Sequence, residues 1–401
     1  MCCIHARVDA SEDGAYGPMY APDAGAFGAT ISSPPADAPA DPAVIESRLS
    51  RRDLIHGTLL TAGGIVGGLL SGRAVAQTPP PPVVHQCTAA VPVVGTGGVP
   101  GAHCFTSPVA GDRILLLGVS GGPMSNPFAG LCAQALVING KPYVIDFGTG
   151  VMRELILSGI PQPSLGTIRT AFLTHHHVDH SFDYPALLIE SWFINHFFGA
   201  GDFEMDVFGP HQMHKFTNDV LEMYKTDIEN RASVLNVSEP KHYVHTHEFD
   251  FRRSGVVMRN DDVEVSATRV IHGPLDAFAF RFDIVATGKS VVFSGDTAFS
   301  TNLIDLAHGA DFLVHEAMYI PALLQSAPPQ RADVISHHFP TIHTPAEDVG
   351  IVAREAGVRT LVLDHLLPVF VPENVWVSEV RKNYDGNLIV GRDRMQISVS
   401  A

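Results

Sequence analysis

The stretch Leu173-Thr174-His175-His176-His177-Val178-Asp179-His180 decides how the rest of this chain is interpreted. It joins a short apolar run, residues 171–173, to four histidines and a carboxylate within six residues. Such a run is typical of a buried strand that carries a loop into a functional site. Side chains two apart on an extended segment share a face, so His175 and His177 can bind one cation while Asp179 and His180 turn toward a second. The alternative is a histidine-rich surface loop.

Later segments repeat this pattern, in which a predicted strand ends at residues of the kind that bind metals. The strands are predicted at 263–271, 291–293, 312–314 and 360–363, and the residues that follow them are His272, Asp296, His315-Glu316 and Asp364-His365. His343 precedes a helix predicted to run to Gly357, with Thr344 and Glu347 as a capping box. Repetition at successive strand ends predicts that these side chains share one site.

Hairpins and helices fill the remainder of the folded part. Residues 133–138 and 143–145 are predicted strands joined by a turn at Asn139-Gly140, and two more hairpins are predicted at residues 260–261 and 287–289. Asp146 is predicted to fix a loop near the site. The helix predicted over residues 184–198 carries Trp192, Phe193, Phe197 and Phe198, which favour core packing, with the wall of an apolar substrate pocket as the alternative.

The ligand-type residues divide into two sets, as a hydrolytic site with two metal ions requires. We expect His175, His177 and His272 at the first metal, Asp179, His180 and His365 at the second, and Asp296 bridging both. Histidine and carboxylate donors without thiolate favour two Zn²⁺, with iron or manganese as alternatives. A water between the metals, its pKa lowered toward about 7, is the expected nucleophile.

These residues resemble the metallo-β-lactamase superfamily over residues 113–401. The motif formed by His175, His177, Asp179 and His180 matches the superfamily signature, and residues 294–297, 315–318 and 343–344 are similar to the ribonuclease Z branch and its arylsulfatase-like relatives. The resemblance implies an α/β (α+β) fold, the αββα four-layer sandwich. It also implies that Asp179 accepts a proton and that Glu316 and His343 protonate the leaving group. The alternative is that neither residue has a catalytic role, in which case Glu316 caps a helix and His343 merely precedes one.

The charge and composition of the chain limit the kinds of substrate and binding partner that we expect. The formal net charge is −16, and 45% of the 401 residues are hydrophobic. The insertion between His180 and His272 holds 15 Asp and Glu against 8 Lys and Arg, which argues against a basic arm for RNA. We therefore expect a small-molecule ester substrate, no nucleic acid and no stable membrane span. The oligomeric state is open, with a homodimer as one alternative.

The N-terminal region predicts export. Residues 1–49 form a polar leader, and residues 50–76 contain Arg51-Arg52, a modest apolar stretch and Ala74-Val75-Ala76, which resemble a twin-arginine signal peptide. The alternative to a signal peptide is an amphipathic or core helix. The long leader could also reflect a start codon placed too early. Residues 77–112 are a Pro- and Gly-rich linker, in which Cys87 and Cys104 can form a disulfide in a periplasmic or secreted protein, whereas Cys132 is expected to be buried.

The expected function is that of an exported hydrolase with two metals that cleaves a sulfate or phosphate ester of an aryl or apolar alcohol. The presence of Asp296 argues against a β-lactamase, and the acidic insertion argues against a ribonuclease Z. A lactonase acting on acyl-homoserine lactones is the main enzyme alternative. A metal-binding protein without catalysis is a further one, which the complete set of ligand positions disfavours.

Overall fold

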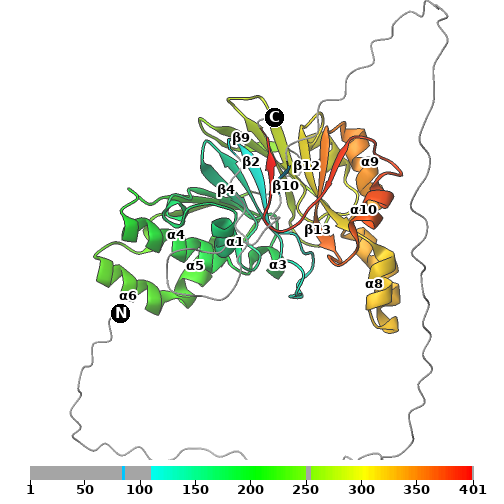
Figure 1. Cartoon of the computed structure of the whole chain (residues 1–401). Coiled ribbons are helices and arrows are strands. Elements are labelled where there is room, and N and C mark those ends of the chain that lie inside the picture. The colour runs from blue at the N-terminus through cyan, green and yellow to red at the C-terminus, as the bar shows by residue number, and fades with distance from the viewer. Residues whose placement is uncertain (1–83, 86–109, 250–253, 400–401) are drawn as a thin grey trace, which may run out of the picture. The chain divides into compact units, whose positions relative to one another are not determined.

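The computed structural model describes residues 110–249 and 254–399, together with the backbone of strand β1 (Val84–His85). Two large β-sheets lie face to face, with helices over their outer faces (Figure 1). The predicted αββα sandwich is confirmed. The predicted leader, export signal and Cys87–Cys104 disulfide lie outside the described residues and stay predictions.

The first sheet has eight strands in the order β1-β15-β2-β3-β4-β5-β6-β7. Besides β1 they are β2 (Arg113–Gly118), β3 (Ala133–Ile138), β4 (Lys141–Ile145), β5 (Thr170–Phe172), β6 (Met205–Gly209), β7 (Val244–Glu248) and β15 (Met395–Ser398). Strands β4 to β7 pair in parallel and the others antiparallel. The hairpin predicted at Asn139-Gly140 is confirmed, and both turn residues have the positive φ that such a turn requires.

The second sheet has seven strands in the order β14-β13-β12-β11-β10-β9-β8. They are β8 (Gly255–Arg259), β9 (Val263–Arg269), β10 (Phe278–Ile284), β11 (Ser290–Phe293), β12 (Phe312–Met318), β13 (Thr360–Leu367) and β14 (Asn387–Val390). Strands β11 to β14 are parallel, and β9 and β11 are both antiparallel to β10. Strands β9, β11, β12 and β13 therefore end at the same edge of the sheet.

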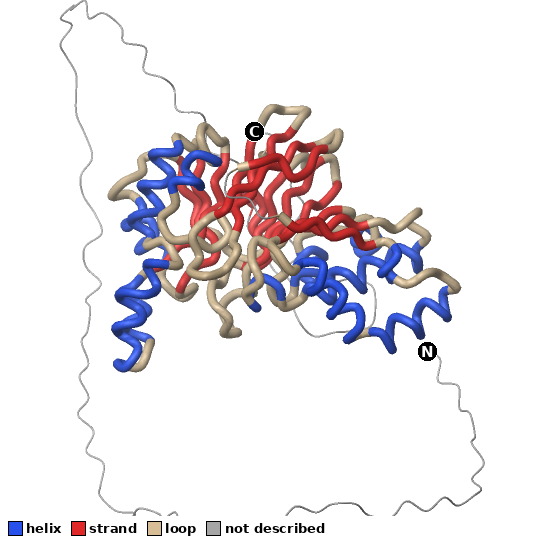
Figure 2. Tube along the Cα trace, turned by 180° about the vertical axis from the view of Figure 1, so that it is seen from behind, coloured by secondary structure: helices blue, strands red, loops and turns tan. Residues whose placement is uncertain are grey.

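Helices cover both outer faces (Figure 2). On the first sheet they are α1 (Val151–Leu157), α2 (Gln162–Leu165), α3 (Val178–Ser181), α4 (Tyr184–Phe198), α5 (Met213–Met223) and α6 (Lys225–Leu235). The helices between the strands of the second sheet are α7 (Thr301–Leu306), α8 (Ile320–Ser326), α9 (Ala346–Ala356) and α10 (Glu373–Val380). Short turns of other helix types are η1 (Pro240–His242), η2 (Pro329–Arg331), η3 (Val334–His338) and η4 (Phe339–Thr341). None of the described helices has the length and apolar character of a membrane span.

Three apolar layers hold these elements together, because successive side chains of a strand point to opposite faces. In β2, Ile114 and Leu116 pack between the two sheets, whereas Leu115 and Leu117 pack under the helices. Trp192 of α4 is fully buried in the layer under the helices, and Trp376 of α10 lies in the corresponding layer of the second sheet. Strands buried on both faces explain why the sequence shows continuous apolar runs rather than alternation.

The capping box predicted at the start of α9 is wrong. The N-cap is Pro345, and no side chain caps the helix. The Thr344 hydroxyl instead donates a hydrogen bond to the carbonyl oxygen of Thr297, at 2.6 Å. Thr344 is fully buried, so it bonds the loop after β11 to the start of α9 instead of turning back on its own helix.

Candidate metal centre

The histidine motif changes direction where β5 ends. His175 and His177 lie in the extended segment between β5 and α3, and His177 is the N-cap of α3. Asp179 and His180 lie within the single turn of α3, so their side chains leave the backbone in another direction. The predicted strand is confirmed, although it ends at Phe172, three residues before His175.

The second sheet supplies the other predicted site residues from its shared edge. His272 follows β9, Asp296 follows β11, and His365 lies within β13. The pairing of β12 with β13 skips His365, since Glu316 opposes Asp364 and Ala317 opposes Leu366. This bulge, together with a φ of 39° at His365, breaks the alternation of β13 and turns the His365 imidazole to the site.

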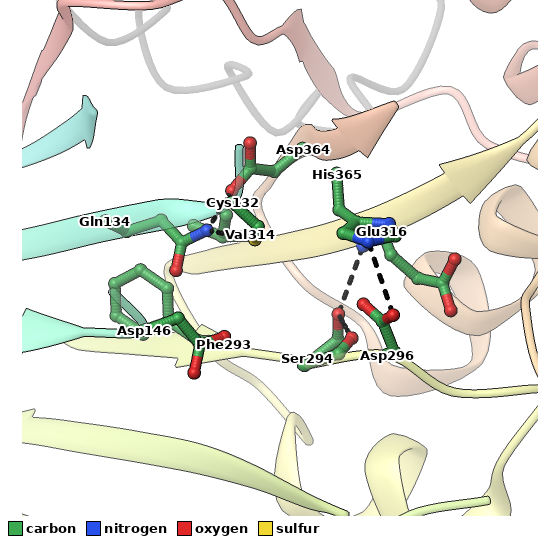
Figure 3. Close-up of a pocket in the computed structure, with 11 residues that line it drawn as sticks. Cys132, Gln134, Asp146, Phe293, Ser294, Asp296, Val314, Glu316, Asp364 and His365 are labelled. Atoms are coloured by element: carbon green, nitrogen blue, oxygen red, sulfur yellow. Dashed lines mark hydrogen bonds and ion pairs between the residues drawn. The ribbon is translucent and has the colours of Figure 1, made fainter. Parts of the chain in front are cut away.

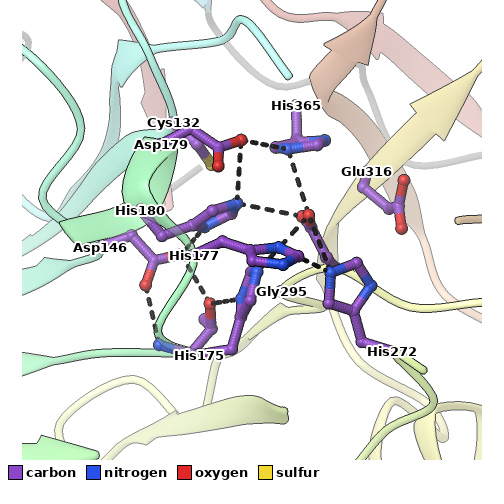
Figure 4. A network of polar contacts seen from close by, with 12 residues as sticks. Cys132, Asp146, His175, His177, Asp179, His180, His272, Gly295, Glu316 and His365 are labelled. Carbon is purple, nitrogen blue, oxygen red and sulfur yellow. Dashed lines mark hydrogen bonds and ion pairs between the residues drawn. The ribbon is translucent and has the colours of Figure 1, made fainter. Parts of the chain in front are cut away.

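The first donor group contains His175, His177, His272 and Asp296, whose ligand atoms all lie within 4.8 Å of one another. The Nε2 atom of His272 is 3.0 Å from Nδ1 of His177 and 3.8 Å from Oδ2 of Asp296. The Nε2 atom of His175 is 3.7 Å from the same carboxylate oxygen. Figure 4 shows the imidazoles of His175, His177 and His272 pointing toward one another.

The second donor group contains Asp179, His180 and His365, again with ligand atoms within 4.8 Å. The Nε2 atom of His365 is 3.4 Å from Oδ2 of Asp179 and 3.3 Å from Oδ2 of Asp296. The Nε2 atom of His180 is 3.3 Å from Oδ1 of Asp296. Asp296 therefore contacts both groups, which is the arrangement expected of a carboxylate that bridges two cations.

Buried nitrogen and oxygen atoms at the centre test whether these residues fit metal ions. Nε2 of His175, Nε2 of His180 and Oδ1 of Asp296 make no hydrogen bond within the described residues. Leaving buried polar atoms unpaired costs about 1–3 kcal/mol each, so such atoms need a partner. Divalent cations between the two groups would satisfy all three, and the donor set fits zinc.

The charge state of the first donor group also suits metal binding. Burial lowers the pKa of His272 to about 4, against the opposing effect of Asp296, and burial lowers the pKa of His175 well below its ordinary value. Burial raises the pKa of Asp296, but His365 and His180 lower it more, so that it lies well below the usual range. Neutral imidazoles and an ionised carboxylate are the forms that coordinate metals.

Outer partners orient the imidazoles by their second ring nitrogen. Nδ1 of His180 is 2.7 Å from Oδ2 of Asp146, and Nδ1 of His272 is 2.7 Å from the carbonyl oxygen of Ile342. Asp146 also accepts hydrogen bonds from the backbone N–H and the hydroxyl of Thr174, at 2.8 and 2.9 Å. Asp146 thus connects the strand leading to His175 with the helix bearing His180, which confirms its predicted loop-fixing role.

Substitution of Asp146 by alanine is expected to weaken metal binding about 10–100-fold without removing any proposed ligand. The His180 imidazole loses the acceptor that fixes its orientation, and two hydrogen-bond donors of Thr174 lose their partner. Competition with a chromophoric chelator would measure the affinity for zinc. The exposed Asp261 provides the control substitution, and an unchanged affinity in Asp146→Ala would contradict the role assigned to this carboxylate.

Glu316 and His343 form a buried pair beside the shared carboxylate. Nδ1 of His343 lies 3.0 Å from Oε2 of Glu316 and 3.9 Å from Oδ2 of Asp296. Glu316 lies inside β12, so the alternative that it caps a helix is wrong. Burial lowers the pKa of His343, but Glu316 raises it more, and the net pKa is above the ordinary value. The pair therefore holds a proton near neutral pH.

Sequence reasoning missed a polar layer behind the donor groups (Figure 3). Nε2 of Gln134 donates hydrogen bonds to Oδ2 of Asp364, at 2.5 Å, and to Sγ of Cys132, at 3.0 Å. Cys132 is buried, as predicted, and forms no disulfide. It lies against Asp146 and His180 rather than in an apolar core. A polar residue such as Gln134 within an otherwise apolar strand is the one signal in the sequence that marks this layer.

The aromatic residues of α4 do not line the metal centre. Trp192 is fully buried in the core, where its indole N–H donates to the carbonyl oxygen of Ser238, as core packing predicts. Phe197 and Phe198 are exposed at the end of α4, about 20 Å along the helix axis from Tyr184. Phe193 lines a pocket separate from the one that contains Asp296 and His365, so the alternative of a substrate pocket wall stays a prediction.

Two donor groups sharing a carboxylate, at one edge of a sandwich of two sheets between helical layers, define a hydrolase of the metallo-β-lactamase fold. The profile of the beta-lactamase superfamily domain matches residues 143–366, more than half of the sequence. The chain belongs to this superfamily, whose fold implies a divalent metal, typically zinc.

Curated relatives and solved structures extend this similarity. Ribonuclease Z of Mycobacterium marinum is 28% identical over 294 residues, which cover 72% of this chain and 99% of that protein. Human tRNase Z, short form, has a TM-score of 0.51 at 21% identity, covering 72% of this chain and 99% of that one. The metallo-beta-lactamase fold protein YhfI from Bacillus subtilis also has a TM-score of 0.51, at 18% identity, covering 70% and 97%.

These relatives contradict the expectation that no nucleic acid is involved, since the curated ones are named as ribonucleases. The expectation rested on the net charge, on the acidic insertion between His180 and His272 and on the export signal, and it treated summed charges as evidence about one site. A charge of −16 is a sum over the whole chain, whereas divalent cations are the largest local charges where they bind and dominate the field there.

Proposed function

We propose that this chain is a phosphodiesterase that uses two metal ions, most simply zinc, to hydrolyse phosphodiester bonds of RNA. The proposed ligands are His175, His177 and His272 for one metal and Asp179, His180 and His365 for the other, with Asp296 shared. When bound, the metals supply Lewis acidity toward the phosphoryl oxygens and a nucleophile at neutral pH.

The observation that carries the proposal is the His343–Glu316 pair, placed 3.9 Å from the shared Asp296 carboxylate. Cleavage of an RNA phosphodiester expels an alkoxide, a strong base that needs a proton as the bond breaks. The Glu316 carboxylate accepts from Nδ1 of His343 and favours the protonated imidazole, whose Nε2–H is the proton proposed for the leaving oxygen. The ribonuclease Z relatives supply the substrate class for this chemistry.

Asp179 has the complementary role of proton acceptor. Burial raises its pKa, but the hydrogen bond to His365 and the charge of His180 lower it more, to about 2. The carboxylate is therefore ionised at neutral pH and stands 3.4 Å from Nε2 of His365.

An aryl sulfate ester is the second candidate substrate. An aryloxide is a weaker base than an alkoxide and needs the proton of His343 less.

One comparison of substrates tests both candidates. The full chain, loaded with zinc, would be assayed on a structured RNA with a single-stranded 3′ trailer, on bis(4-nitrophenyl) phosphate, on 4-nitrophenyl sulfate and on an acyl-homoserine lactone. We expect cleavage of the two phosphodiesters that is lost on chelation and restored by zinc. Turnover confined to the sulfate would support the second candidate, and turnover confined to the lactone would overturn both.

A further inference from the structure

Several large apolar side chains that are close to the proposed ligands in the sequence are exposed to solvent. Each one is at most five residues from a ligand, and together they belong to every segment that supplies one: Val178, Phe182, Ile271, Phe299 and Phe370. His177, the exposed ligand, marks where the centre opens to solvent. Exposed apolar side chains in the segments that supply a polar centre are candidates for binding a partly apolar ligand.

Phe370 is paired with a second exposed phenylalanine. Its ring centroid is 6.2 Å from that of Phe128, with the ring planes at 58°, and the two side chains are 49% and 65% exposed. Phe370 follows β13 five residues after His365, and Phe128 lies in the loop of residues 119–131 between β2 and β3. These two loops bring one aromatic side chain each to the same place.

The 119–131 loop lies directly against a proposed ligand. The backbone of Gly121 approaches the His365 imidazole so closely that a Cβ there would be 2.6 Å from its ring atoms. The Gly121 N–H also donates to the carbonyl oxygen of Leu366, at 3.2 Å. The loop that carries Phe128 is therefore in contact with the metal centre.

Hydrogen bonds hold this loop in one shape. The Asp393 carboxylate accepts from the backbone N–H of Val119 and of Gly130, at 3.1 and 2.7 Å. Within the loop, Oδ1 of Asn126 accepts from the backbone N–H of Phe128, at 2.9 Å, while its Nδ2 donates to the Ser120 hydroxyl, at 2.7 Å. A loop fixed at both ends and in the middle offers a preorganised surface, and binding to such a surface costs little ordering entropy.

We propose that Phe128 and Phe370 form a subsite for an aromatic ring of the ester substrate, next to the metal centre. This inference rests on the proposed function and refines its substrate. The ring is a nucleobase if the substrate is RNA and an aryl group if it is a simpler ester, and both stack on phenylalanine in the same way. The ester group then lies toward His365 while its ring packs on the pair.

Equilibrium binding of non-hydrolysed ligands tests the subsite without relying on turnover. Calorimetry on the zinc-loaded full chain would compare phenylphosphonate with methylphosphonate, and adenosine 5′-monophosphate with ribose 5-phosphate. The members of each pair share the anionic group and differ in the ring. We expect the ring to tighten binding about tenfold and the double variant Phe128→Ala/Phe370→Ala to lose that gain. A gain for phenyl alone indicates an aryl ester, and a gain for adenosine indicates a nucleic acid.

Phe197 and Phe198 provide a matched control. They are 59% and 49% exposed, contact each other at 5.1 Å between ring centroids, and lie at the far end of α4. Phe197→Ala/Phe198→Ala should keep the full preference for the ring, and so should Phe128→Tyr, which retains an aromatic ring at the proposed subsite. Zinc content would confirm that each variant keeps an intact centre.

Two outcomes overturn the subsite: an unmodified chain that binds both members of each pair equally, or a double variant at Phe128 and Phe370 that keeps the preference. Failure of the proposed function has a different signature. A preference for the ring that depends on Phe128 and Phe370, in a chain that cleaves no phosphodiester, would leave the subsite standing and reject the phosphodiesterase.

Discussion

Replacement of Asp296 by alanine is expected to remove at least one of the two metals and to lower kcat/KM about a thousandfold or more. Its carboxylate lies within 3.3 to 3.8 Å of donor nitrogens from both groups, so its loss affects both metals at once. Metal ions contribute several kcal/mol of transition-state stabilisation, and about 4 kcal/mol corresponds to roughly a thousandfold in rate. Metal content by mass spectrometry and kcat/KM for bis(4-nitrophenyl) phosphate would measure the two effects.

The control for this substitution is the exposed Asp261, whose replacement by alanine should leave metal content and rate unchanged. Urea unfolding of the zinc-free proteins separates a loss of ligand from a loss of fold. An Asp296→Ala protein that still binds two zinc ions and turns over at the rate of the unmodified chain would refute the shared-carboxylate assignment.

The substitutions His343→Gln and Glu316→Gln are expected to lower kcat for RNA about 10²–10⁴-fold while both metals stay bound. Nδ1 of His343 lies 3.9 Å from Oδ2 of the shared Asp296, but His343 is not one of the proposed ligands, so its loss is expected to remove a proton rather than a ligand. Glu316 acts through His343, to which it is hydrogen-bonded at 3.0 Å, and is a positioning residue. Glutamine at 316 can still accept the hydrogen bond from the Thr297 backbone N–H, at 2.6 Å, which keeps the loop after β11 in place.

The leaving group distinguishes proton donation from a structural role. The same variants should lose much less activity on bis(4-nitrophenyl) phosphate, whose aryloxide leaves without a proton. Rates for both substrates, with metal content measured in parallel, give the comparison. Equal losses on RNA and on the nitrophenyl ester, accompanied by a loss of zinc, would show that His343 supports the centre rather than the leaving group.

The metal ligands could be predicted because their signals are local. Each lies close to the end of a short apolar run, and runs such as 171–173 and 291–293 are read directly from the sequence. Because strands of one direction end at one edge, residues that follow different strands can be expected to meet. The donor groups around Asp296 contain the same residues that this rule brings together.

Other features depended on which elements pack together. The sequence predicts strands that stop before Glu316 and His365, but β12 and β13 continue past both residues because they pair with each other there, beyond their last pairs with β11 and β14. The bulge that turns His365 inward arises from that pairing. Likewise, Thr344 matched a helix cap in sequence, yet a backbone carbonyl 47 residues away offered it a better partner.

The substrate is the feature that sequence patterns predicted least well. Aromatic residues concentrated in α4 favoured an aryl group, but Trp192 is buried in the core. The structure instead pairs the exposed rings of Phe128 and Phe370, which are 242 residues apart in the sequence. Net charge favoured a substrate other than nucleic acid, and the ribonuclease Z relatives contradict it. Both inferences summed a property over many residues, whereas recognition depends on a few residues at one opening.

The sequence by itself determined the αββα fold, through the resemblance of its motifs to the metallo-β-lactamase superfamily, and it predicted the nine proposed site residues and their division into two metal groups. The motifs stand at the ends of apolar runs, so they are properties of short segments. Only the tertiary structure decided that Asp146 orients His180, that Glu316 pairs with His343, and that two distant loops bring Phe128 and Phe370 together. Those contacts join residues far apart in the chain, and their geometry is set by how the two sheets pack.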